Sequence, residues 1–172
     1  MLAAEGVVDM QYKLERLSEE HRKPAIDILN YYVDNGFAAF SESKLPYSLF
    51  DIYLQVSAGY PALAVRLASG EMVGFAWLQA YHPSAAFRGT AEIGYFLRHD
   101  CTRRGIGKAI LDRFVNEAGE IGIGSILAST SSLNEPSINF HTKNGFIECG
   151  RFQRIGLKFG RDFDLVWLQR QI

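Results

Sequence analysis

The chain has few of the features that mark secreted, membrane or metal-binding proteins. It holds only two cysteines, Cys101 and Cys149, which lie far apart and show neither zinc-site spacing nor a disulfide framework. No run of about 20 apolar residues occurs, so we expect no membrane-spanning helix. The segment 1–10 lacks the basic start and long apolar stretch of a signal peptide. We therefore expect a cytoplasmic protein with reduced thiols.

An excess of one charge sign is missing as well. The 18 Lys and Arg residues face 19 Asp and Glu residues, which gives a net charge of −1. Such a chain has no summed field to attract nucleic acid, so we expect no nucleic-acid partner. The missing apolar run and the missing metal-ligand spacing likewise lead us to expect no membrane partner and no resident metal. Repeats and Pro/Ser-rich linkers are also absent, and a chain of 172 residues then predicts a single domain over 1–172. We expect 1–10 to be a disordered N-terminal extension.

The apolar pattern predicts an α/β (α+β) fold with the element order β-α-α-β-β-β-α-β-α-β-β. Three consecutive strands followed by βαβ units indicate a mixed sheet covered by helices. Helices are expected over 19–35, after a Ser48 cap, from Ile106, and over the segment "NEPSINFHTKNG", which Asn134 caps. The expected strands are "YKLERLS", "PALAVRL", "MVGFAWLQAYH", "TAEIGYFL", "SILAST", "FIECGRF" and "DFDLVWL", with "QRIGLKFGR" as a loop between the last two.

The segment 97–114, "LRHDCTRRGIGKAILDRF", joins an expected strand to an expected helix through an arginine- and glycine-rich turn. Glycines allow close approach of the backbone to a ligand, and the N–H groups and dipole of a helix start favour an anion. Arg103, Arg104 and Lys108 add positive charge around the same point. The turn therefore predicts a phosphate site, although it matches neither a Walker A loop nor a dinucleotide fingerprint. A glycine-rich surface turn without a ligand is the alternative.

The stretch "EIGYFLRHDCTRRGIGKAIL" resembles the acetyl-CoA-binding motif of the GNAT N-acetyltransferases, written Gln/Arg-x-x-Gly-x-Gly/Ala, with Thr102 at the first position. The segments "GYPALAV", "GEMVGFAWLQAYHP", "FRGTAEIGYFL", "NEPSINFHTKNGF" and "KFGRDFDLVWLQR" occur in the order of the phosphinothricin N-acetyltransferase branch. The resemblance covers roughly residues 12 to 170. It implies a GNAT fold with a mostly antiparallel central sheet and acetylation of small amino-acid-like amines by direct transfer.

The resemblance also implies how acetyl-CoA, the co-substrate, is held, and that the chain forms a homodimer. Backbone groups at the end of the "TAEIGYFL" strand should pair with the pantetheine arm, as an added strand would. The glycine-rich turn should hold the pyrophosphate, and an asparagine at the next helix start should face the cofactor. The expected cofactor-binding residues are Tyr95, Phe96, Leu97, Arg103, Arg104, Gly105, Ile106, Gly107, Lys108 and Asn134.

Acetyl transfer requires an amine without its extra proton, so the site needs a base. Alternation along "TAEIGYFL" puts Glu92 on the face opposite Ala91 and Ile93, where partial desolvation would raise its pKa. A solvated strand glutamate is the alternative, and the resemblance favours the catalytic base. His141 lies where many GNAT proteins have a tyrosine general acid and this branch tends to have histidine. It is the candidate for protonating the thiolate or for helping to deprotonate the amine.

Arg88 and Lys158 are the candidates for binding the carboxylate of the acceptor, since arginine and lysine pair with carboxylates. The polar segments "SESKLP", "HPSAAFR" and "RIGLKFGR" lean basic, which favours an anionic acceptor. Two alternatives stay open. The chain acetylates a polyamine, an aminoglycoside or a protein terminus, or it binds acyl-CoA without turnover.

Overall fold

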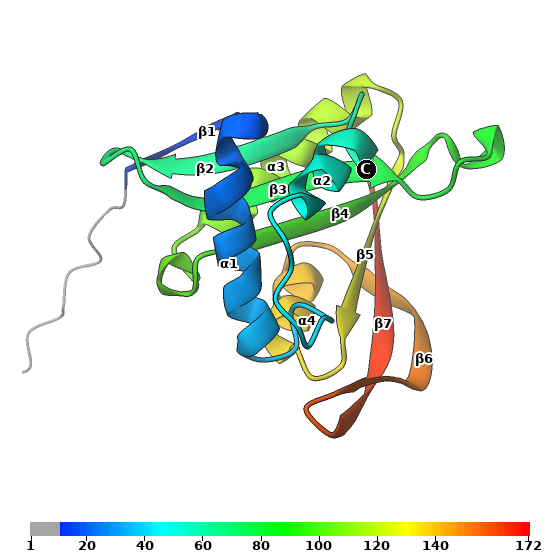
Figure 1. Ribbon diagram of the computed structural model, residues 1–172. Helices are drawn as coiled ribbons and strands as arrows, with labels where there is room; N and C mark the ends of the chain where they lie inside the picture. Colours follow the sequence, from blue (N-terminus) through cyan, green and yellow to red (C-terminus); the bar gives the residue numbers. More distant parts are fainter. Residues whose placement is uncertain (1–10) are drawn as a thin grey trace, which may run out of the picture.

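The computed structural model describes residues 11–172, and the extension expected at 1–10 lies outside the described residues. The described chain forms one seven-stranded sheet with α-helices on both faces (Figure 1). The strands are β1 (Tyr12–Arg16), β2 (Ala62–Leu67), β3 (Met72–Ala80), β4 (Thr90–Leu97), β5 (Ser125–Ser131), β6 (Ile147–Lys158) and β7 (Arg161–Gln171). The helices are α1 (Arg22–Asp34), α2 (Leu49–Val56), α3 (Ile106–Glu120) and α4 (Glu135–Lys143).

The strand order across the sheet is β1-β2-β3-β4-β5-β7-β6. Only β4 and β5 run parallel, and the other neighbouring strands pair antiparallel. The predicted element order and the mixed, mostly antiparallel sheet are both confirmed. The parallel pair divides the sheet into a half with β1 to β4 and a half with β5 to β7.

The two halves stay joined over a short distance only. β4 and β5 pair at Thr90↔Ser125, Ala91↔Ile126 and Glu92↔Leu127, and beyond these positions they no longer pair with each other. Figure 1 shows β4 and β5 diverging from this point. We call the space between residues 93–97 of β4 and 128–131 of β5 the β4–β5 opening.

Each face of the sheet has its own apolar core. On one face, Ile110 and Phe114 of α3 pack with Ala91 and Ile93 of β4, and α4 packs against the same cluster. On the other face, residues of α1 and α2 pack with Phe75 and Trp77 of β3. Odd-numbered residues of β4 therefore face α3 and α4, while Glu92, Gly94 and Phe96 face the α1 and α2 side. None of the helices within residues 11–172 is long and apolar enough to cross a membrane.

Three local predictions need correction. Most of the segment expected as a loop between the last two strands belongs to β6, which runs to Lys158. The turn itself has only Phe159 and Gly160, both with positive φ, as a two-residue hairpin turn requires.

The first helix begins with a 3₁₀ turn, and α1 proper starts at Arg22. Ser48 and Asn134 occupy helix N-cap positions as expected, but neither side chain makes a capping hydrogen bond.

Candidate active site

Glu92 lies at the last position of β4 that pairs with β5, at the closed end of the β4–β5 opening. The Ser129 hydroxyl of β5 donates a hydrogen bond to Glu92 Oε1 at 3.0 Å. Gln79 lies opposite Glu92 on β3, and its own Oε1 accepts a hydrogen bond from Trp77 Nε1 at 2.9 Å. The carboxylate is thus held by Ser129 of β5 and lies beside Gln79 of β3.

Partial burial changes the acidity of this carboxyl. Desolvation raises the pKa of Glu92, while the hydrogen bond from Ser129 and the nearby polar side chain of Gln79 oppose that rise. A carboxylate with a raised pKa is a better proton acceptor near neutral pH than a solvated one. The predicted placement of Glu92 is confirmed as a half-buried carboxylate beside the opening, and its role as a base stays a prediction. Ser129 and Gln79 were not predicted, because only the pairing of β3, β4 and β5 brings them to Glu92.

The backbone of β4 presents its polar groups to alternate sides. The Arg98 N–H donates to Val73 O of the neighbouring β3 side, so even-numbered residues of β4 point their backbone groups toward β3. Tyr95 and Leu97 therefore point their N–H and C=O groups into the opening, where β5 no longer pairs with them. Phe96 was expected to offer backbone groups there too, but its N–H and C=O face β3. Tyr32 Oη donates to Leu97 O at 2.6 Å, which leaves Tyr95 as the fully available residue.

The arginine- and glycine-rich turn leads into α3 as predicted. Gly105 is the N-cap of α3 with φ 81°, a left-handed conformation that glycine adopts without strain. Arg103 is also left-handed, with φ 59°, and both it and Arg104 are exposed. Ile106 is buried in the core, so only its backbone can reach a ligand. Exposed N–H groups at the start of a 15-residue helix, together with two arginines, suit a phosphate group.

Three residues of the turn make local contacts that the sequence does not predict. A Cβ on Gly107 would lie 3.4 Å from the Phe140 ring, an ordinary contact distance, so α3 and α4 lie near each other at this position. The Thr102 hydroxyl donates to His99 O at 2.9 Å, which places it within the turn rather than toward a ligand. The Lys108 ammonium pairs with Asp112 one helical turn on.

His141 lies in α4 on the face of the sheet opposite Glu92, and it is only 3% exposed. Its Nε2 lies 2.6 Å from Tyr95 Oη, and its Nδ1 lies 2.7 Å from Ser137 O. Because a carbonyl only accepts, Nδ1 carries the proton and Nε2 accepts from the tyrosine. Burial lowers the pKa of His141 and raises that of Tyr95, so both groups are neutral at pH 7.

This placement excludes one of the two roles considered for His141. It does not help Glu92 deprotonate an amine, because the two side chains project from opposite faces of the sheet. Proton donation toward a thiolate stays a prediction, and it would run through the Tyr95 hydroxyl. Asn134 precedes α4. Its side chain makes no capping hydrogen bond, so its amide is available to a ligand.

The two candidate carboxylate binders differ. Arg88 is exposed at the end of the loop between β3 and β4, and its Nη1 donates to Ala85 O at 3.2 Å. Its remaining donors are open to an acceptor. Lys158 is fully buried, and its Nζ donates to the carbonyls of Tyr32, Gly36 and Ala39. An ammonium group with all three donors in use has none left for a substrate, which corrects the expected contact.

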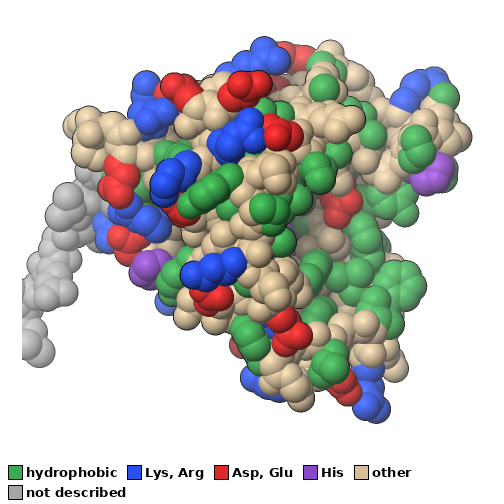
Figure 2. All heavy atoms as spheres, in the orientation of Figure 1, with side chains coloured by type: hydrophobic (Ala, Val, Ile, Leu, Met, Phe, Trp, Pro, Cys, Tyr) green, Lys and Arg blue, Asp and Glu red, His purple; other side chains and the backbone are tan. Residues whose placement is uncertain are grey.

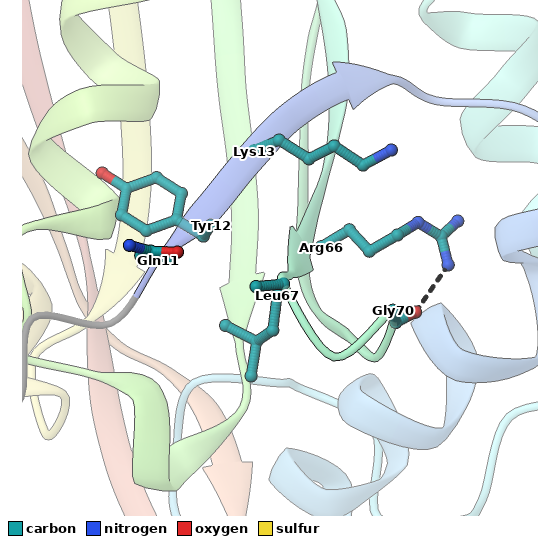
Figure 3. A pocket seen from close by; sticks show the side chains of 7 residues that line it. Gln11, Tyr12, Lys13, Arg66, Leu67 and Gly70 are labelled. Carbon is teal, nitrogen blue, oxygen red and sulfur yellow. Dashed lines mark hydrogen bonds between the residues drawn. The ribbon is translucent and has the colours of Figure 1, made fainter.

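A second polar region lies at the other end of the sheet. A cavity of about 410 Å³ is lined by Gln11, Tyr12, Lys13, Arg66, Leu67, Ala68 and Gly70 (Figure 3). Arg66 pairs with Met72 at the start of β3, whereas Gln79 beside Glu92 lies near its end. The cavity is therefore separate from the candidate active site. Glu15, Glu20 and His21 lie nearby, close enough together to be considered as metal ligands. The Arg66 guanidinium contacts both Glu15 and His21, so a cation already occupies this cluster.

Comparison with known proteins finds relatives in both sequence and fold. The profile of the Acetyltransferase (GNAT) family matches residues 25–146. The chain is 32% identical over 144 residues to an L-methionine sulfoximine/L-methionine sulfone acetyltransferase of Pseudomonas aeruginosa, which covers 83% of this chain and 84% of that protein.

Two solved structures share the fold along nearly the whole chain. One is a GNAT superfamily phosphinothricin acetyltransferase from Sinorhizobium meliloti in complex with AcCoA, with a TM-score of 0.88 and 25% identity, covering 95% of this chain and 89% of that one. The other is a ribosomal-protein-alanine N-acetyltransferase from Brucella melitensis, with a TM-score of 0.84 and 27% identity, covering 93% and 99%.

Proposed function

This chain belongs to the GNAT family of acetyl-CoA-dependent N-acetyltransferases, and we propose that its acceptor is the primary amine of a small amino-acid-like molecule. Phosphinothricin and methionine sulfoximine represent the acceptor type. The observation that carries the proposed amine chemistry is Glu92, a half-buried carboxylate with a raised pKa at the closed end of the β4–β5 opening. The similarity to an L-methionine sulfoximine/L-methionine sulfone acetyltransferase supports the acceptor class.

The residues around the opening suit acetyl-CoA. The cofactor supplies an acetyl group activated as a thioester. The start of α3, with Arg103, Arg104 and the N–H groups from Gly105 to Lys108, provides positive charge and donors for its phosphates. The backbone of Tyr95 provides a donor and an acceptor for a peptide-like arm, as a strand edge does. Asn134 provides an amide at the start of α4.

Glu92 would accept the proton of the acceptor's ammonium group, which makes the nitrogen nucleophilic. An α-amino group has a pKa near 8, so most of it is protonated at pH 7 and a base raises the reactive fraction. On the other side of β4, the Tyr95 hydroxyl is the candidate proton donor for the departing thiolate, for which its O–H would turn from His141 Nε2 to the sulfur, while the unprotonated Nε2 only accepts from it. Arg88 is the candidate partner of the acceptor's carboxylate.

We propose that the protein acts as a homodimer. The edge strand β6 exposes several large apolar side chains, among them Ile147 at 75%, Leu157 at 65% and Ile155 at 61%. Figure 2 shows hydrophobic side chains gathered on the side of the molecule where β6 and β7 lie. Covering such a patch is favourable. Sedimentation equilibrium of wild type and Leu157→Glu tests this proposal: a dimeric wild type and a monomeric variant support it, and a monomeric wild type contradicts it.

The proposed reaction is tested by free-thiol release from acetyl-CoA with a panel of amines. The panel holds phosphinothricin, methionine sulfoximine, common L-amino acids, spermidine, an aminoglycoside and a peptide that begins with alanine. We expect the highest kcat/KM for an amino-acid analogue with a free α-amino and an acidic group. The peptide is included because of the similarity to the ribosomal-protein-alanine enzyme, and a preference for it would replace the proposed acceptor class. Acetyl-CoA binding without thiol release for any amine would favour a binding module.

A further inference from the structure

Lys158 is a buried cation held entirely by backbone carbonyls. Its Nζ lies 2.7 Å from Ala39 O, 2.8 Å from Gly36 O and 3.2 Å from Tyr32 O, and its side chain has no exposed surface. A charge buried without hydrogen bonds would be strongly destabilising, so these three bonds keep the ammonium group in place.

The three carbonyls and the lysine belong to different halves of the sheet. Lys158 ends β6, in the half formed by β5, β7 and β6. Tyr32 belongs to α1, which packs on β3 in the half formed by β1 to β4. Gly36 and Ala39 lie in the segment that follows α1. The lysine therefore ties the end of one half to the helix that covers the other.

Tyr32 carries this connection on to β4. Its carbonyl accepts from Lys158, and its hydroxyl donates to Leu97 O at 2.6 Å, at the end of β4 where the opening is widest. Two further contacts join the same parts: Glu42 Oε1 accepts from the Phe159 N–H at 2.6 Å, and Phe40 stacks on Phe163 with a centroid distance of 5.7 Å.

The connection lies at the far end of the opening from the paired positions of β4 and β5. The β4 and β5 strands pair at only three positions, all at the closed end, so the sheet halves can pivot there. On the α3 and α4 face, the contact of Tyr95 with His141 spans the opening. On the α1 and α2 face, the connection runs from Lys158 through Tyr32 to Leu97. We propose that Lys158 and Tyr32 form a brace that sets the width of the β4–β5 opening and thereby its affinity for acetyl-CoA.

The inference rests on acetyl-CoA binding in the opening, so the first measurement is the Kd of the wild type by calorimetry. Lys158→Met removes the charge and the donors, and Tyr32→Phe removes only the bond to Leu97. Phe50→Leu is the control, because Phe50 is fully buried against Phe75 within one half and its substitution lowers stability without touching the brace. All proteins are compared well below their melting temperatures.

We expect Lys158→Met to raise the acetyl-CoA Kd about tenfold or more, Tyr32→Phe to raise it by a smaller factor, and Phe50→Leu to leave it within twofold. A lysine that only stabilises the fold would lower the melting temperature and leave the Kd unchanged, which would overturn the inference. If Lys158→Met does not fold, Tyr32→Phe decides by the same comparison. A wild type that does not bind acetyl-CoA would instead contradict the proposed function.

A second readout needs no ligand. Spin labels at the exposed residues Gln55 of α2 and Gln153 of β6, in a Cys149→Ser background, report the separation of the two halves. The brace predicts a narrow distance distribution for the wild type and a broader one for Lys158→Met and Tyr32→Phe. Unchanged distributions in both variants would overturn it.

Discussion

Ser129 Oγ lies 3.0 Å from Glu92 Oε1 and donates a hydrogen bond to it, from the strand on the far side of the opening. The two residues come together because β4 and β5 pair up to Glu92↔Leu127 and then separate. This bond lowers the pKa of Glu92 against the rise that burial causes. The position of Ser129 therefore tunes the pH range over which the base is ionised.

Replacing Ser129 by alanine should move the acid limb of the pH–rate profile. Without the hydroxyl, the pKa of Glu92 rises further, so activity is lost at a higher pH as the solution is acidified. The measurement is kcat/KM from pH 5 to 9 for wild type and Ser129→Ala. A limb that stays in place, or moves to lower pH, would show that Glu92 does not govern it.

The glycine at the start of α3 should matter through its backbone, and the neighbouring arginine through its charge. Gly105→Ala forces a non-glycine residue into φ 81°, at a cost of roughly 1–2 kcal/mol, so we expect the acetyl-CoA Kd to rise about tenfold. Arg103→Gly removes the backbone strain of a left-handed arginine and also removes its charge. Because salt screens that charge, the variant should weaken acetyl-CoA binding mainly at low salt. Titrations at two ionic strengths separate these effects. A Gly105→Ala protein with wild-type affinity would remove this turn from the phosphate site.

The buried histidine should make the fold less stable in acid. Burial lowers the pKa of His141 below 6.5, so the unfolded chain takes up a proton that the folded chain resists. The stability that neutral His141 contributes is complete above about pH 7 and is lost as the pH falls toward its folded pKa. His141→Gln should flatten this dependence in denaturant titrations between pH 7.5 and 5. Equal slopes for both proteins would contradict the neutral state of His141.

Local pattern was enough to predict the order of the elements and the face on which Glu92 lies, because strand alternation and helix spacing are local properties. Alternation alone assigned Glu92 to the face opposite Ala91, which the structure confirms. Alternation could not say which backbone edge of β4 is free, so Phe96 was grouped with Tyr95 although its backbone faces β3.

Contacts between distant segments were not predictable from the chain. The burial of Lys158 depends on how the β6–β7 hairpin meets the end of α1, more than a hundred residues away in sequence. A lysine in a segment read as a loop suggested a surface position, whereas the lengthened strand carries it into the interior. The Tyr95–His141 contact likewise requires α4 to pack on β4.

The most direct test of the account replaces Glu92 by glutamine. We expect kcat to fall about 10²- to 10⁴-fold near pH 7 while acetyl-CoA binds as before, because a base is lost and the phosphate site is untouched. The variant should be at least as stable as the wild type at pH 8, since a carboxyl with a raised pKa destabilises the fold when it ionises, and this difference should vanish by pH 4. Full activity of Glu92→Gln from pH 6 to 9 would contradict the assignment of Glu92 as the base.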